Sequence, residues 1–226
     1  VSSNIRYRSS KGPPGQPLSR RLNNVHDDLI LDIGGVRVGI LGVTIDAQPR
    51  DYVVYGYDRP TLSATVRQAL ARLRAQGAQL IIALTHQEMT EDVRLASDFP
   101  EIDLIVGGHE HFYQRRRGGR TWITKADADA KTVITIDVRA SAEGLTVEEP
   151  HKIDLGPGVV KDPVVESEVQ ASLAELVKVV KSEKGFDLME EVGTTENLLE
   201  GVEPAVRGRE TALGNFLADV VRDRMQ

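Results

Sequence analysis

Two short apolar runs separated by a helical stretch constrain the fold of this chain more than any other feature. Residues 79–84 read QLIIAL and residues 102–106 read IDLIV. Nearly continuous apolar runs of this length are typical of strands that are covered on both faces. Between them, residues 90–97 carry a helical pattern with an acidic start, and Pro100 ends it. The order strand, helix, strand predicts a βαβ unit with two parallel strands.

The segment before this unit predicts a hairpin and a helix. Apolar residues alternate through residues 29–40 on both sides of a central Gly-Gly pair. Such a pair between alternating runs indicates a two-residue hairpin turn. A helix is then expected between Asp58 and Gly77, with Pro60 in its first turn and an apolar stripe at helical spacing.

The second half of the chain predicts strands followed by helices. Residues 122–126, 132–139 and 145–153 are strand-like and suggest an antiparallel meander. A Gly- and Pro-rich linker follows, and then come an amphipathic helix that closes near Gly185 and a last helix with its apolar face between residues 213 and 221.

Composition and charge narrow the possible partners. Of the 226 residues, 40% are hydrophobic, which is enough for a sizeable core. Lys and Arg number 28 and Asp and Glu number 34, so the net charge is −6, which argues against nucleic acid. The basic residues 115–117, with Arg120 nearby, are interpreted as a solvated turn rather than an anion site. The absence of cysteine excludes disulfides and thiolate metal sites. No apolar run reaches the roughly 18 residues that a membrane span needs.

Three of the five histidines follow the two buried strands. His86 ends the first strand, and His109 and His111 follow the second. Because parallel strands end at the same edge of a sheet, these side chains are expected to converge there. Gly107 and Gly108 are expected to supply the tight turn that lets two nearby histidines point inward. Imidazole is a common metal ligand. Spacing alone leaves metal binding and a hydrogen-bonded structural role open, since no carboxylate plainly completes a site.

Other candidate ligands have weaker support. His26 lies just before the hairpin and His151 lies near the end of the meander, and both are interpreted as structural or surface residues. Asp127 and Asp129 alternate in the sequence KADADA. They could bind a metal, but a polar strand edge is the favoured interpretation.

At these motifs the chain resembles a known family. IIALTH followed by IDLIVGGHEH is similar to the last two metal-binding motifs of the calcineurin-like metallophosphoesterases. RGRETALGNFLADVVR resembles the Arg-x-x-Glu-Thr-x-Leu-Gly-Asn helix that opens the C-terminal domain of the bacterial 5′-nucleotidase branch. SSNI near the start resembles the segment that follows the Gly-Asn-His-Glu motif of the family.

The resemblance implies a fold and a domain organisation. The fold is expected to be α/β, as part of a four-layer α/β/β/α sandwich followed by a linker helix and the beginning of an α/β C-terminal domain. Residues 1–155 would be the second half of the catalytic domain, residues 156–187 the linker and helix, and residues 188–226 the start of the C-terminal domain.

The resemblance also implies a chemistry. The parent enzyme would hydrolyse phosphomonoesters, in particular nucleotides, with a water activated by two divalent ions of zinc, manganese or iron. His86 and His109 would bind one ion and His111 the other. Bacterial members are usually exported, so the same location is expected here.

The chain departs from the family pattern, and this leaves alternatives open. It contains no Asp-x-His, no Gly-Asp pair and no Asn-His, so the family's acidic ligands and its proton-donor histidine are absent, and no catalytic residue is assigned. We interpret the chain as an internal fragment with weak or no activity alone. A non-catalytic binding or scaffolding domain is the alternative. Within enzymes, a cyclic-nucleotide phosphodiesterase or a UDP-sugar hydrolase remains open. Sheet edges exposed in a fragment would favour association.

Overall fold

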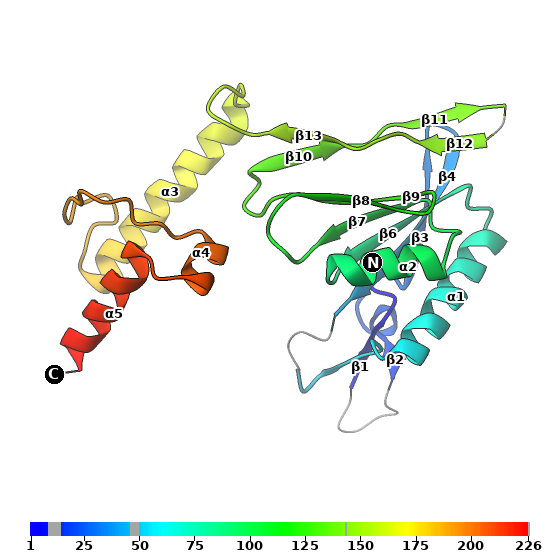
Figure 1. Cartoon of the computed structure of the whole chain (residues 1–226), viewed down its shortest axis with the longest axis horizontal. Coiled ribbons are helices and arrows are strands. Elements are labelled where there is room, and N and C mark those ends of the chain that lie inside the picture. Colours follow the sequence, from blue (N-terminus) through cyan, green and yellow to red (C-terminus); the bar gives the residue numbers. More distant parts are fainter. Residues whose placement is uncertain (9–14, 46–49, 143, 226) are drawn as a thin grey trace. The chain divides into compact units, whose positions relative to one another are not determined.

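The chain folds into an α/β structure with two compact units. A computed structural model describes residues 1–8, 15–45, 50–142 and 144–225. The units are Val1–Val159 and Val160–Gln226 (Figure 1). The α/β class predicted from the sequence is confirmed, whereas the assignment of residues 1–155, 156–187 and 188–226 to parts of two domains stays a prediction.

A six-stranded mixed sheet forms the centre of the first unit. In spatial order its strands are β3 (Asp28–Ile33), β4 (Val36–Thr44), β6 (Leu80–His86), β7 (Leu104–Gly108), β9 (Thr121–Lys125) and β8 (Gln114–Gly118). The four inner strands are parallel, and the two edge strands pair antiparallel to their neighbours. The predicted βαβ unit is therefore confirmed, with β6 and β7 adjacent.

The hairpin that joins β3 to β4 follows its sequence signal. Gly34 and Gly35 have φ values of +56° and +83°, and Ile33 pairs directly with Val36. Two consecutive positive φ values define the turn whose twist matches that of the strands, and glycine adopts them without a side-chain clash.

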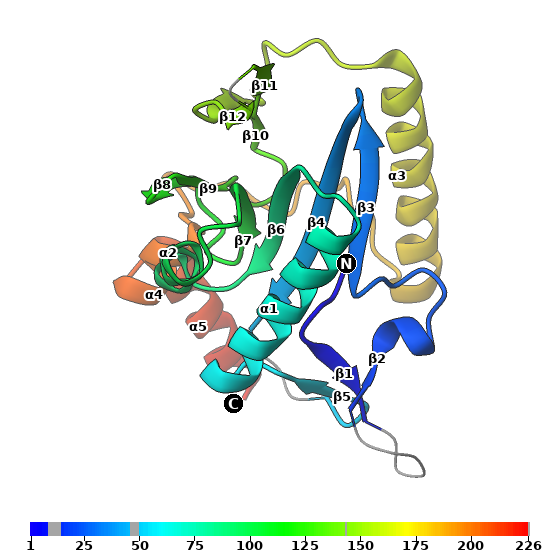
Figure 2. The same ribbon diagram turned by 90° about the vertical axis from the view of Figure 1, so that its right-hand side faces the viewer.

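Two helices cover one face of the sheet (Figure 2). Helix α1 (Arg59–Ala75) begins where the Asp58 carboxylate accepts a hydrogen bond from the Thr61 N–H, and helix α2 (Met89–Asp98) connects β6 to β7. Their apolar sides pack on one fully buried row of the sheet, which consists of Leu41, Ala83, Ile105 and Ile123. The opposite face carries exposed Leu31, Ile33 and Leu84, the apolar surface expected of a sheet that packs in a sandwich.

Smaller sheets complete the first unit. One contains β1 (Ile5–Tyr7), β2 (Gln16–Pro17) and β5 (Val53–Tyr55), next to a 3₁₀ helix, η1 (Leu18–Arg20). Two antiparallel ribbons pair β10 (Thr132–Thr135) with β13 (His151–Asp154) and β11 (Val138–Ser141) with β12 (Gly144–Val147). The predicted meander is wrong for its first strand, residues 122–126, because β9 joins the main sheet parallel to β7.

The basic residues predicted to form a turn instead lie on edge strand β8. The Arg117 guanidinium lies 4.9 Å from the Trp122 ring centroid, and that of Arg115 donates a hydrogen bond to the Pro150 carbonyl at 2.9 Å. Both contacts are made by guanidinium groups, and charged side chains are common on edge strands, where they discourage pairing with another chain.

The second unit contains three helices. They are α3 (Pro163–Lys184), α4 (Glu203–Gly208) and α5 (Ala212–Arg224). Gly185, with φ +79°, ends α3 as the sequence predicts, whereas the cap that Asp162 forms at its start was not anticipated. Helix α5 is also confirmed, whereas α4 was not anticipated. In the part of the chain that the structure describes, no helix has the length and apolarity needed to cross a membrane.

The close packing of β8 against α2 yields a test. A β-carbon on Gly118 would lie 2.7 Å from the Ala96 β-carbon, closer than such atoms approach. Gly118→Ala should therefore lower the free energy of unfolding by about 1–3 kcal/mol. Gly156→Ala is the control, because a β-carbon there meets nothing within 4 Å. Urea denaturation of both variants checks this, and equal stabilities would contradict the packing.

Candidate functional site

Two histidines converge where β6 and β7 end. His86 is the last residue of β6 and pairs in register with Gly108, so His109 follows directly beside it. The two imidazole rings lie edge to face, with their centroids 5.3 Å apart and their planes at 78°. The parallel strands thus bring together the first two of the three predicted ligands.

The third predicted ligand, His111, lies two residues further along and is exposed. Burial lowers the pKa of His86, and positive charge at His109, Lys125 and His111 lowers it further. The neutral imidazole, which is the form that binds metals, is favoured at His86.

The histidines themselves, and not the glycines before them, make the turn. Gly107 and Gly108 are the last residues of strand β7. His109 and His111 have φ values of +102° and +66°, in the region that residues with a β-carbon rarely adopt. The predicted role of the two glycines in a tight turn is therefore wrong. Strain of this kind persists where the surrounding structure enforces it, often at functional sites.

A carboxylate orients the His109 ring. The His109 Nε2–H donates to Glu88 Oε1 at 3.0 Å, since an ionised carboxylate can only accept. In the neutral ring this leaves Nδ1 as the nitrogen with a free electron pair. Metal-bound histidines are commonly held by a carboxylate in this way. Glu88 lies next to the predicted ligands in sequence, but its role was not anticipated.

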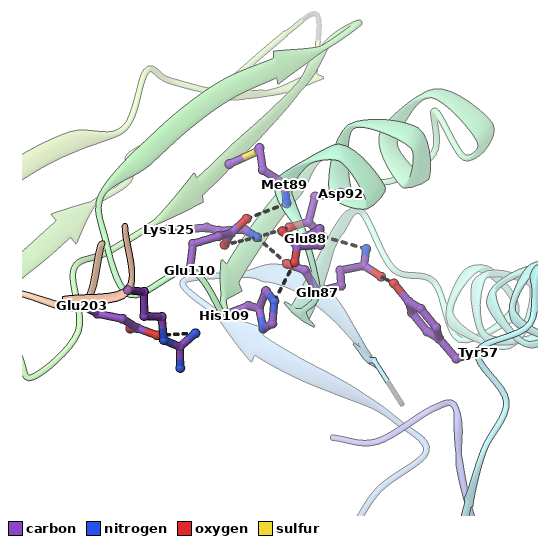
Figure 3. Close-up of polar contacts among 10 residues, drawn as sticks. Tyr57, Gln87, Glu88, Met89, Asp92, His109, Glu110, Lys125 and Glu203 are labelled. Atoms are coloured by element: carbon purple, nitrogen blue, oxygen red, sulfur yellow. Dashed lines mark hydrogen bonds and ion pairs between the residues drawn. The ribbon is translucent and has the colours of Figure 1, made fainter. Parts of the chain in front are cut away.

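A buried ionic cluster of Lys125, Asp92 and Glu110 lies near His109 (Figure 3). Lys125, at the end of β9, is 1% exposed, and its Nζ lies 2.6 Å from Glu110 Oε2 and 3.0 Å from Asp92 Oδ2. The same Nζ donates to the Gln87 carbonyl at 2.5 Å. Sequence reasoning missed this cluster. The local signal was a lysine placed at the end of the short strand TWITK.

Hydrogen bonds extend the cluster on both sides. The Gln87 amide donates to Asp92 Oδ1 at 2.8 Å and accepts from the Tyr57 hydroxyl at 3.2 Å. Burial and nearby carboxylates raise the pKa of Tyr57 to about 12, so the phenol keeps the proton that it donates. On the other side, Glu110 Oε1 accepts from the Met89 N–H at 2.6 Å.

The surroundings of the cluster change the pKa values of its two carboxylates differently. Burial raises the pKa of Asp92 although Gln87 and Lys125 stabilise its anion. Burial also acts to raise the pKa of Glu110, but hydrogen bonds from Lys125 and the Met89 N–H lower it overall. The pKa values of the two carboxylates that contact Lys125 thus shift in opposite directions.

The remaining candidates have structural surroundings. Asp127 accepts hydrogen bonds from the Tyr113 N–H and the Thr132 hydroxyl, both at 3.0 Å, in the segment between β9 and β10, so the expected polar strand edge is instead a loop. Asp129 has a positive φ of +62°. His26 and His151 are exposed, as a surface role requires.

The donor chemistry of this edge fits a divalent metal, but the number of donors does not complete a site. Within the described ranges, no group of three or more His, Asp or Glu side chains is arranged to hold a metal ion. Two imidazoles converge, and one of them is already oriented by a carboxylate. A cavity of about 460 Å³ adjoins His86, with Asn4, Thr44 and Gly108 in its lining.

The structure thus combines a mixed α/β sheet with histidines after two adjacent parallel strands. In fold, the chain matches the 5′-nucleotidase precursor of Thermus thermophilus with a TM-score of 0.70 at 22% identity, covering 97% of this chain and 44% of that one. It also matches the sulfate thiohydrolase SoxB of Thermus thermophilus with a TM-score of 0.59 at 25% identity, covering 77% and 32%.

Sequence comparison finds relatives with similar names. The chain is 28% identical over 208 residues to the trifunctional nucleotide phosphoesterase YfkN of Bacillus subtilis, covering 86% of this chain and 14% of that protein. It is 26% identical over 247 residues to the snake venom 5′-nucleotidase of Naja atra, covering 98% and 43%. No family model matches the chain. The predicted resemblance to 5′-nucleotidases of the metallophosphoesterase superfamily is confirmed, and the chain spans less than half the length of these relatives.

The positive φ of His109 yields a stability test. His109→Gly should be more stable than His109→Ala by about 1 kcal/mol or more, because only glycine adopts φ +102° without strain. The same pair of substitutions at exposed His151 in strand β13 should give the opposite order, since glycine weakens a strand relative to alanine. Thermal unfolding of the four variants measures both differences. Alanine matching glycine at position 109 would contradict the strained conformation.

Proposed function

We propose that the protein hydrolyses phosphomonoesters, nucleotides in particular, and that the sheet edge at His86 and His109 binds divalent metal ions for this reaction. The observation that carries the proposal is the 5.3 Å approach of these two imidazole rings at the ends of adjacent parallel strands. Ligands of open α/β sheets bind at this edge. The relatives named as 5′-nucleotidases and nucleotide phosphoesterases support the same reaction class.

Each histidine has a proposed role. His86 and His109 bind one ion and His111 binds a second, with zinc, manganese or iron as the candidates. Divalent ions offset the negative charge of the phosphoryl oxygens, which is the chemistry they would supply here. Glu88 holds the His109 ring through Nε2, and this leaves Nδ1 to bind. No catalytic proton donor is assigned to a residue of this chain.

The activity is proposed for the whole protein, because the chain covers less than half of its relatives. For the 226 residues alone we expect weak metal binding and little hydrolysis, since two-metal sites use carboxylate ligands in addition to imidazoles. Nucleoside monophosphates are the proposed substrates, and cyclic nucleotides and UDP-sugars are the alternatives. Export is proposed from the relatives that are named for venom. The edge strands β3 and β8 are the candidates for association between copies.

Metal binding tests the proposal directly. Calorimetric titration of this chain with Zn²⁺ should show weak binding, and His109→Ala should reduce the affinity at least about 10-fold, because it removes a ligand and not only an orienting partner. His151→Ala is the matched control, since that histidine is exposed on β13. Equal affinities of the wild type and His109→Ala would contradict a metal site at this edge.

Turnover tests the reaction. The whole protein should release phosphate from AMP, lose this activity in a chelator and regain it with added divalent ions, while His151→Ala keeps it. Zn²⁺ binding that depends on His109 would favour a non-catalytic binding domain if AMP releases no phosphate, a cyclic nucleotide is not opened to its monophosphate and a UDP-sugar is not cleaved to UMP and a sugar phosphate.

A further inference from the structure

The Lys125 ammonium connects the two loops that carry the histidines. One of its oxygen partners is the carbonyl of Gln87, the residue directly after His86. A second is the carboxylate of Glu110, the residue between His109 and His111. The third is Asp92 on helix α2, which joins the two strands. A single buried cation therefore contacts both loops and the helix between them.

The sheet provides a path for this side chain. Val43, Thr85, Gly107 and Lys125 pair in one row across four parallel strands. A β-carbon on Gly107 would lie 2.9 Å from Lys125 Cε and 2.8 Å from Thr85 Oγ1. Glycine at 107 thus leaves the room in which the lysine chain runs along the sheet to reach Gln87, and this is a reason for glycine there other than a turn.

Stability alone does not account for a buried cation at this place. A buried ion pair is offset by the cost of removing its charges from water, and an apolar replacement is often as stable. What an apolar side chain cannot do is hydrogen-bond a backbone carbonyl of one loop and a carboxylate of the other. The partners of Lys125 therefore point to a role in fixing the relative positions of the loops.

We propose that Lys125 is a positioning residue, whose ammonium holds the His86 loop and the His109–His111 loop in the arrangement that binds metal. This inference rests on the metal-binding role proposed above. Lys125 itself touches neither metal nor substrate in this proposal, and acts through Gln87 and Glu110.

The test compares Zn²⁺ affinity with stability. Lys125→Met should weaken Zn²⁺ binding by about 10–100-fold, the effect typical of losing a group that orients metal ligands. Lys131→Met is the matched control, because that lysine is 70% exposed in the same unit. Gly118→Ala is a second control, since it destabilises the same sheet at the opposite end of β9 and should keep wild-type affinity. Affinity of Lys125→Met within 2-fold of wild type would overturn the proposal.

A second variant covers the case in which Lys125→Met does not fold. Gly107→Ala keeps every charge but places a methyl group against Lys125 Cε, so it should also weaken Zn²⁺ binding. Wild-type affinity in this variant would count against the positioning role of Lys125. In side-chain ¹H–¹⁵N spectra recorded without metal, the His86 and His109 signals should shift in Lys125→Met and in Gly107→Ala. They should stay unchanged in Gly118→Ala. Unshifted signals in these two variants would overturn the positioning role of Lys125, whether or not the wild type binds Zn²⁺. Absence of Zn²⁺ binding by the wild type would instead contradict the proposed metal site.

Discussion

The parallel pairing of β6 with β7 is the constraint on which the candidate site depends. The register pairs His86 with Gly108, so the loops that follow β6 and β7 begin side by side at one edge of the sheet. Helix α2 returns the chain between the strands, and its buried residues anchor it on the sheet. A register slip of one residue would move the His86 side chain to the other face of the sheet and separate it from His109. The apolar core that fixes the register therefore also fixes the distance between the two imidazoles.

The two faces of the sheet differ in chemistry and burial at this edge. The row of Thr44, His86 and Gly108 faces away from the helices, towards the cavity beside His86. The neighbouring row faces the helices, and its side chains at Val43, Thr85 and Lys125 are buried. The histidine side of the sheet is thus backed by Lys125 and its carboxylate partners on the helix side. The short loops after the strands connect the two sides.

Regular structure was predictable from the sequence because its signals are local. The Gly34-Gly35 turn, the Asp58 cap and the Gly185 helix end each depend on a few adjacent residues, and the structure has all three. The convergence of His86 with His109 followed from strand order alone. These features require only periodicity and the direction of the chain.

The features that sequence reasoning missed depend on residues far apart in the chain. Lys125 is buried because Asp92 and Glu110 arrive from other segments and because Gly107 leaves space, and none of this is visible in the pattern around residue 125. The positive φ values were likewise assigned to glycines by propensity, whereas tertiary contacts impose them on His109 and His111.

The strained histidines and the buried cation are parts of one arrangement. Glu110 lies between two residues with positive φ, and both of its carboxylate oxygens are bound, one to the Met89 N–H and one to Lys125. An unfavourable backbone conformation persists only where its surroundings leave the chain no alternative. With both oxygens of Glu110 fixed, the residues on either side of it cannot relax towards negative φ without breaking a buried ion pair. The ion pair between Lys125 and Glu110 therefore helps to hold the backbone orientation of the histidines on either side of Glu110.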